Sequence, residues 1–264
     1  YRWLHALDFA DELDNASMSD WLRNKEDIWD QVVDEEFKPI QLDNQQFEPF
    51  DSASINNQLK PHQLFYHAGI GQKAVQHFFI ADLQDQFHEE EIQISITGKE
   101  HARDLTAPPA MSSQDQIIVR QESLKRMCWE RYQEWHWNKY ENVMGTALSF
   151  YPFEDSIPEA LQLMVETEQH TLIRHELGEM AISADYAQRW SDMMLRIMGS
   201  RAELQARAVR DQLADCTHTL PLLLEKRLGR SGFFGARFRE CAQRALLLPK
   251  WGFNSRQPLW LSRL

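Results

Sequence analysis

The stretch that decides the predicted fold is residues 156–182, SIPEALQLMVETEQHTLIRHELGEMAI. Ser156 and Glu159 form a capping box with Pro158 in the first turn, which is the sequence signature of a helix start. Apolar residues then recur at three- and four-residue steps to the end of the stretch, the spacing of one buried helix face. The pattern predicts a long amphipathic helix, followed by another that runs to Met198.

Three polar residues interrupt the apolar face of this helix. An α-helix advances about 100° per residue, so Glu168, His175 and Glu179 fall within roughly 40° of one another. Side chains four residues apart leave adjacent turns in the same direction, as two ligands of one metal ion must. Residues 175–179, HELGE, are close to the zinc motif His-Glu-x-x-His, with Glu179 in place of the second histidine. Glu176 then stands where the motif has its general base.

A second polar face is predicted on the helix that a capping box of Ser200 and Glu203 begins. Asp211, Asp215 and His218 share one side of it, and a carboxylate three residues before a histidine is the spacing of di-metal helix bundles. Whether His218 belongs to the site is left open. The metal ligands predicted from the two faces are Glu168, His175, Glu179, Asp211 and Asp215, and the ion would be zinc, iron or manganese.

The same polar residues also have a structural interpretation. Carboxylates and an imidazole buried together can fix the packing of two helices without binding anything, provided that their charges are compensated. Two classes of function therefore stay open. One is a metal-dependent enzyme, hydrolytic or oxidative, with Glu176 as general base and an unknown substrate. The other is a non-catalytic helical adaptor or assembly protein whose polar cluster is structural.

Most of the remaining chain is predicted to be helical. Residues 91–97 are an exception, because Ile92, Ile94 and Ile96 alternate with polar residues as in a strand, whose best partner is residues 116–120. The two segments could form a small hairpin-like piece, or residues 116–120 could equally begin the next helix. We therefore expect a mainly α, single bundle-like domain with at most a small β element near residues 91–120. The further predicted helices span residues 19–37, 61–88, 123–149 and 200–228, the last kinked by Pro221. Residues 1–40 are predicted to form an N-terminal helical appendage, and residues 41–264 the main domain.

Composition and charge exclude several classes of protein. The 264 residues carry a net charge of −12, which argues against a general nucleic-acid binder. No apolar run reaches the roughly 20 residues that span a bilayer, so we expect no membrane partner. Three cysteines without a zinc or disulfide spacing, and no signal segment, favour a cytoplasmic protein.

The charge is unevenly distributed along the chain. Residues 1–100 hold 20 acidic and 7 basic side chains, whereas residues 201–264 hold 5 acidic and 12 basic ones. We expect the basic C-terminal part to lie against acidic surface from residues 1–50, within the chain or across a homodimer. The basic residues meant are Arg227, Arg230, Arg237, Arg239 and Arg244.

Two histidines outside the helical faces are weaker candidates. His67 lies near Gly69 and Gly71, where the backbone could approach a ligand closely. His77 lies off the apolar stripe of the predicted helix, and we expect it to be solvated.

Five blocks of sequence occur in order along the chain: Asp51–Asn56, His62–Gly69, Gly98–Asp104, His175–Glu179 and Arg207–Asp215. In these blocks the chain resembles an uncharacterised bacterial family of unknown function. The resemblance runs from about residue 20 to residue 250 and implies that the blocks belong to one domain. It brings no known activity.

Overall fold

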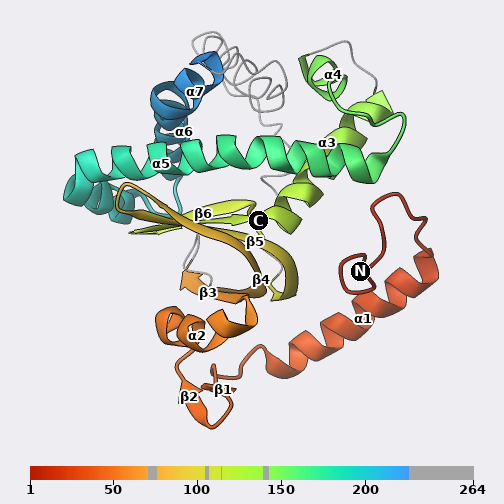
Figure 1. The fold of residues 1–264 in the computed structure, drawn as a ribbon. Helices are drawn as coiled ribbons and strands as arrows, with labels where there is room; N and C mark the ends of the chain where they lie inside the picture. Colours follow the sequence, from red (N-terminus) through yellow and green to blue (C-terminus); the bar gives the residue numbers. More distant parts are fainter. Residues whose placement is uncertain (71–75, 105–106, 114, 139–142, 226–264) are drawn as a thin grey trace.

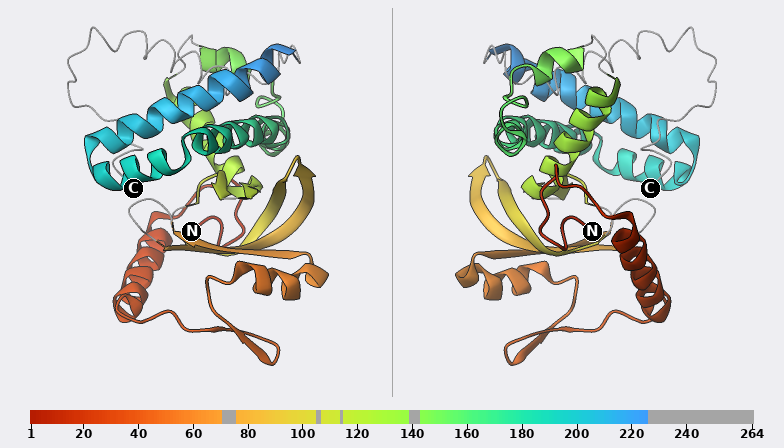
Figure 2. Two further views of the ribbon diagram at one scale, coloured as in Figure 1. Left: turned by 90° about the vertical axis from the view of Figure 1, so that its left-hand side faces the viewer. Right: turned by 90° about the vertical axis from the view of Figure 1, so that its right-hand side faces the viewer.

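Beneath a layer of helices, the protein has a strongly curled five-stranded sheet (Figures 1 and 2). The computed structural model describes residues 1–70, 76–104, 107–113, 115–138 and 143–225. The strands follow the order β3-β4-β5-β7-β6, and every neighbouring pair is antiparallel except β5 and β7. Their bounds are Leu64–Ile70 (β3), Gln76–Glu89 (β4), Ile92–Arg103 (β5), Ala110–Ser113 (β6) and Gln116–Arg120 (β7).

The prediction of a mainly α, bundle-like single domain with at most a small β element is therefore wrong. Ile40–Leu42 (β1) and Gln45–Phe47 (β2) form a second, two-stranded sheet in addition to the large one. The small β element expected near residues 91–120 is the centre of a sheet that also contains β3 and β4, where a helix was predicted. The described chain is a mixed structure of helices and sheet.

The wrongly predicted helix at residues 61–88 has a physical cause. Strand β4 carries four apolar residues in succession, Phe78 to Ala81, and lies between two apolar clusters, one on each face of the sheet. A strand covered on both faces loses the alternation of apolar and polar residues that identifies a half-exposed strand. Its apolar residues then also fit helical spacing.

The pairing predicted between residues 91–97 and 116–120 is confirmed. Ile94 of β5 pairs with Ile117 of β7, and Ile96 pairs with Val119, all within the core. The two strands are parallel, so no hairpin joins them, and β6 lies on the other side of β7.

One long helix, α5 (Ile157–Ile197), passes over the sheet (Figure 1). Its start agrees with the capping box, because Ser156 Oγ accepts a hydrogen bond from the Glu159 N–H at 3.4 Å. The break expected near Ile182 is absent, and the 41 residues form a single helix. The other helices around α5 are α3 (Gln121–Asn138), α4 (Val143–Leu148), α6 (Arg201–Ala214) and α7 (Leu220–Glu225), with a π-helical turn at Asp215–Thr219 where Pro221 was expected to kink the chain.

Helix α5 forms the core with different partners along its length. Its N-terminal half packs against Leu124 and Cys128 of α3. Farther along, α5 covers the face of the sheet formed by β5 and β7. The side chains of α5 in this second cluster are Ile173, Leu177 and Met180, and those of the sheet are Ile94, Ile96, Ile117 and Val119. Among the described helices, none is both long and apolar enough to cross a membrane.

Helix α2 (Ser52–Leu59) covers the edge strand β3. The Asn56 side chain donates a hydrogen bond to the Tyr66 carbonyl (2.8 Å) and accepts one from the Tyr66 N–H (2.7 Å). Ser52 Oγ accepts a further bond from the Ala68 N–H at 3.0 Å. These contacts satisfy backbone groups that would otherwise be free to pair with another chain.

Candidate functional site

Four of the five predicted metal ligands lie together where α5 packs against α6. His175 and Glu179 come from α5, Asp211 from α6 and Asp215 from the π-helical turn. Glu168 is not part of this cluster, because it lies about two turns earlier on α5. It is fully buried in the described structure, near Cys128 of the apolar core.

Both ring nitrogens of His175 are hydrogen-bonded to carboxylates. Nδ1 lies 2.8 Å from Asp215 Oδ1, and Nε2 lies 3.2 Å from Glu179 Oε1. Burial alone would lower the pKa of His175, but the hydrogen bonds and charges of Asp215 and Glu179 outweigh it and raise the pKa to about 10. The ring is therefore doubly protonated at neutral pH and has no lone pair for a metal ion.

The Glu179 carboxylate is compensated from both helices. It forms an ion pair with Arg210 of α6, and it shares a hydrogen bond with Asp211. Burial and this hydrogen bond raise the pKa of Asp211, so the proton shared between the two carboxyl groups resides on Asp211. Arg210 also lies over the ring of Trp190, its guanidinium carbon 5.5 Å from the ring centroid. The cluster is thus a self-compensating network of charges.

The prediction of a metal-binding cluster is corrected by this arrangement. Within the described ranges, no group of three or more His, Cys, Asp or Glu side chains is placed to hold a metal ion. The physical reason is that α6 contributes Arg210 as well as carboxylates, so an arginine and an imidazolium supply the positive charge that a metal would have supplied.

Gly178 explains why the HELGE segment lies at this helix crossing. A Cβ on Gly178 would be 2.9 Å from the Cα, the Cβ and the carbonyl oxygen of Ala214. Only a residue without a side chain lets the backbones approach so closely. The segment therefore places a residue without a side chain between His175 and Glu179, which both form ion pairs at the crossing. It is a helix-packing element instead of a zinc motif.

Glu176, the predicted general base, forms its hydrogen bond outside this network. Its carboxylate accepts a hydrogen bond from Ser112 on β6, and burial raises its pKa. It therefore joins α5 to the edge of the sheet. His218 lies outside the cluster, with Nδ1 2.8 Å from the hydroxyl of Thr217.

The sequence-based prediction missed the partners that complete these contacts. Arg210 directly precedes Asp211. Its side chain is positively charged and cannot bind a metal cation, so a search for metal ligands does not identify it. The buried ion pair between Glu100 and Arg120 was also missed. The two residues belong to different strands, and only the folded sheet brings them together. Arg120 N–H (Nε) donates to Glu100 Oε1 at 2.7 Å, and both side chains are fully buried.

A separate candidate site is the apolar face of α1 (Asn15–Val32), which lies away from the helical layer (Figures 1 and 2). None of its residues is buried. At about 100° per residue, the large apolar side chains fall within an arc of roughly 140°. They are Trp21, Leu22, Ile28, Trp29 and Val32, continued by Val33 beyond the helix.

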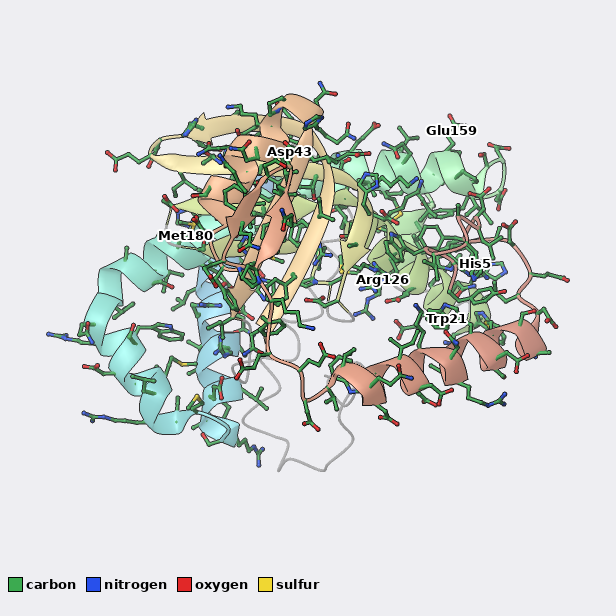
Figure 3. The ribbon with its side chains drawn as sticks, turned by 90° about the horizontal axis from the view of Figure 1, so that it is seen from below. His5, Trp21, Asp43, Arg126, Glu159 and Met180 are labelled. Atoms are coloured by element: carbon green, nitrogen blue, oxygen red, sulfur yellow. The ribbon has the colours of Figure 1, made fainter. Side chains whose placement is uncertain are left out.

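The α1 apolar face is largely uncovered. Trp29 is 62 % exposed, and Leu22 is 53 % exposed. Trp21 is the exception: its ring packs edge-on against Tyr1 at 5.9 Å, and Figure 3 shows it near His5. A continuous exposed apolar face of this kind is typical of an interaction surface.

The fold and these contacts define a protein of curled mixed sheet and covering helices, whose polar cluster joins two of the helices. Residues 1–120 match the N-terminal domain of a family of unknown function, DUF6866, and residues 125–252 match its C-terminal domain. The chain belongs to this family. Neither a curated protein nor a solved structure gives a significant match.

Proposed function

We propose that this protein is a non-catalytic assembly protein, in which α1 of one copy binds the basic C-terminal segment of a second copy. The observation that carries the proposal is the exposed apolar face of α1, with Trp29 at its centre. The intrachain role of the His175 cluster supports the non-catalytic reading, since its charged groups compensate one another.

Charge complementarity identifies the partner segment. Residues 15–37 hold seven acidic and two basic side chains, whereas residues 226–264 hold nine basic and one acidic. The latter segment, which contains the arginines predicted to meet acidic surface, lies outside the described residues. Its sequence includes three consecutive leucines, Leu246–Leu248, and the aromatic residues Trp251 and Phe253. An apolar segment flanked by basic residues fits an apolar helix face flanked by acids.

The position of α7 favours binding between two copies. In Figures 1 and 2, α7 lies above the helical layer, whereas α1 lies on the opposite side of the molecule. The chain leaves the described structure at the end of α7. Because residues 226–264 begin on the side of the molecule away from α1, the proposal has them bind α1 of a second copy.

Sedimentation velocity of the full chain over a range of concentrations tests the proposal. We expect reversible dimers for the natural sequence. Trp29→Asp should weaken dimerisation roughly 100-fold, because burying an aromatic side chain contributes about 3 kcal/mol. Gln31→Asp is the matched control: it adds the same charge on the opposite side of α1 and should leave the dimer intact.

A second measurement tests whether residues 226–264 are the segment that binds α1. A synthetic peptide of residues 226–264 should bind the natural chain and compete with dimerisation, and its affinity should fall with added salt. A chain that stays monomeric at all concentrations, or a Trp29→Asp variant that dimerises normally, would contradict the proposal.

A further inference from the structure

The two edge strands of the curled sheet line one pocket. β3 and β6 are at opposite ends of the strand order, yet residues of both border a cavity of about 370 Å³ together with the start of α2. Small-molecule sites commonly have volumes of roughly 300–1,000 Å³. The polar residues that line the cavity include His67, His77, Ser52, Ser112, Ser113 and Gln116.

Two imidazole rings in this pocket have nitrogens without partners. His67 is only 7 % exposed, and its Nδ1 has no hydrogen-bond partner in the described structure. The same is true of His77 Nε2. The ring centroids are 5.2 Å apart. Nearly all buried polar atoms in native proteins are paired, so these nitrogens indicate that a polar group binds beside them.

Gly69 allows the two rings to converge. A Cβ at this position would lie 2.9 Å from His77 Nε2 and 3.2 Å from His67 Nε2. Both rings therefore pack directly against the Gly69 backbone, and a residue with a side chain at this position would force them to move. The expectation that the backbone near His67 could approach a ligand stays a prediction, whereas His77, which was expected to be solvated, is half-buried.

The charges around the pocket favour an uncharged ligand. Burial, with smaller contributions from His77 and Arg120, lowers the pKa of His67 to about 4, so the ring is neutral at pH 7. Burial likewise lowers the pKa of His77. Among the described residues that line the cavity there is no lysine or arginine, and the lining carboxylate of Asp51 caps α2 by accepting a bond from the Ser54 N–H at 3.1 Å. The described lining therefore offers no cation that would pair with an anionic ligand.

The lining favours hydroxyl groups in particular. A neutral imidazole presents one donor and one acceptor, and a hydroxyl group, which both donates and accepts, suits either tautomer. Ser52, Ser113 and Gln116 offer further bonds of the same kind. Phe50, Ile70 and Met111 also line the cavity and give it an apolar side. The C–H face of a sugar ring can pack against such a side while its hydroxyls bond to the polar side.

We infer that this pocket binds a small, uncharged, polyhydroxylated molecule of monosaccharide size, held by His67 and His77 above Gly69. This site is independent of α1 and of the proposed assembly. Ser112 links the wall of the pocket to the helical layer, because its hydroxyl donates a hydrogen bond to Glu176 of α5.

Saturation-transfer-difference NMR on the full chain tests the inference, with D-glucose, D-galactose, D-mannose and myo-inositol as probes. At least one probe should show transfer, and titration should give its Kd. Gly69→Ala should raise the Kd at least tenfold, because the added methyl group would displace both histidine rings that bind the ligand. His77→Phe, which keeps a ring but removes both nitrogens, should do the same. His88→Phe is the matched control, since His88 is exposed farther along the same strand.

The outcomes that overturn the inference are equally definite. They are no transfer from any of the four probes, unchanged binding in both pocket variants, or displacement of the bound probe by inorganic phosphate at constant ionic strength. Circular dichroism melting identifies a variant that has failed to fold. If Gly69→Ala is such a variant, His77→Phe decides the outcome, because His77 is only half-buried and its replacement retains the ring.

Discussion

At the level of single residues, His175 makes stability depend on pH. The pKa of His175 is raised in the folded protein to about 10 by Asp215 and Glu179, against burial, whereas an unfolded histidine has a pKa of about 6.5. A raised folded pKa means that the stabilisation is fully present below about pH 6.5 and is lost as pH rises towards 10. Urea unfolding midpoints should therefore fall across this range, and His175→Ala should remove much of the slope.

The size of the His175 effect can be checked at neutral pH. Removing the ring leaves Asp215 and Glu179 without their shared cation, so we expect His175→Ala to lower the free energy of unfolding by about 3 kcal/mol. His218→Ala is the control, because His218 lies outside the cluster. Equal stability of the His175→Ala and natural chains would show that the network contributes nothing.

The pair of Glu100 and Arg120 is a second residue-scale test. Glu100 also accepts a hydrogen bond from the Ser123 hydroxyl at 3.1 Å, and Arg120 lies over the Phe79 ring at 4.1 Å. Glu100→Gln should cost about 3–5 kcal/mol, because it leaves a buried guanidinium without its counter-charge. The double variant Glu100→Leu/Arg120→Met should recover part of this loss in urea unfolding. A double variant less stable than Glu100→Gln would contradict the explanation.

At the level of elements, the crossing of α5 and α6 depends on Gly178. We expect Gly178→Val to force the helices apart and to lower the unfolding free energy by about 2–3 kcal/mol, as overpacking of a close contact does. Thermal unfolding followed by circular dichroism measures the effect. Gly199→Ala is not a suitable control because Gly199 has a φ of +74°, so Ala202→Val on the exposed start of α6 serves instead. If the two variants have equal melting temperatures, the close approach of α5 and α6 at Gly178 does not contribute to stability.

The same elements show how far the sequence could predict the structure. Capping boxes at Ser156 and Ser200 are local signals, and both correctly located helix starts. The strand at residues 91–97 was predicted correctly because apolar and polar residues alternate along it. Strand β4 was missed because an apolar cluster lies on each of its faces. A strand buried on both faces can be recognised only from the tertiary structure. The polar cluster was found by helical spacing, but its chemistry depends on Arg210, which is opposite in charge to any expected ligand.

At the level of the whole molecule, the two family domains share one core. The match to the N-terminal domain ends at residue 120, yet the face of β5 and β7 is covered by Ile173, Leu177 and Met180 of α5. We expect a chain of residues 1–124 alone not to reach the folded state, because this apolar face stays open to water. Its amide NMR spectrum should show little dispersion, in contrast to the full chain. A well-dispersed spectrum of the fragment would mean that the sheet is stable without α5.

Because the sheet depends on α5, its apolar face stays uncovered until α5 has been synthesised. Val119 of β7 leaves the ribosome well before Ile173 of α5. At roughly 5–20 residues per second, the interval between them lasts about 3–10 s. During that time the nascent chain carries a complete set of strands with one apolar face uncovered. A chaperone that binds short apolar segments has its best opportunity in this interval, and the arrival of α5 ends it.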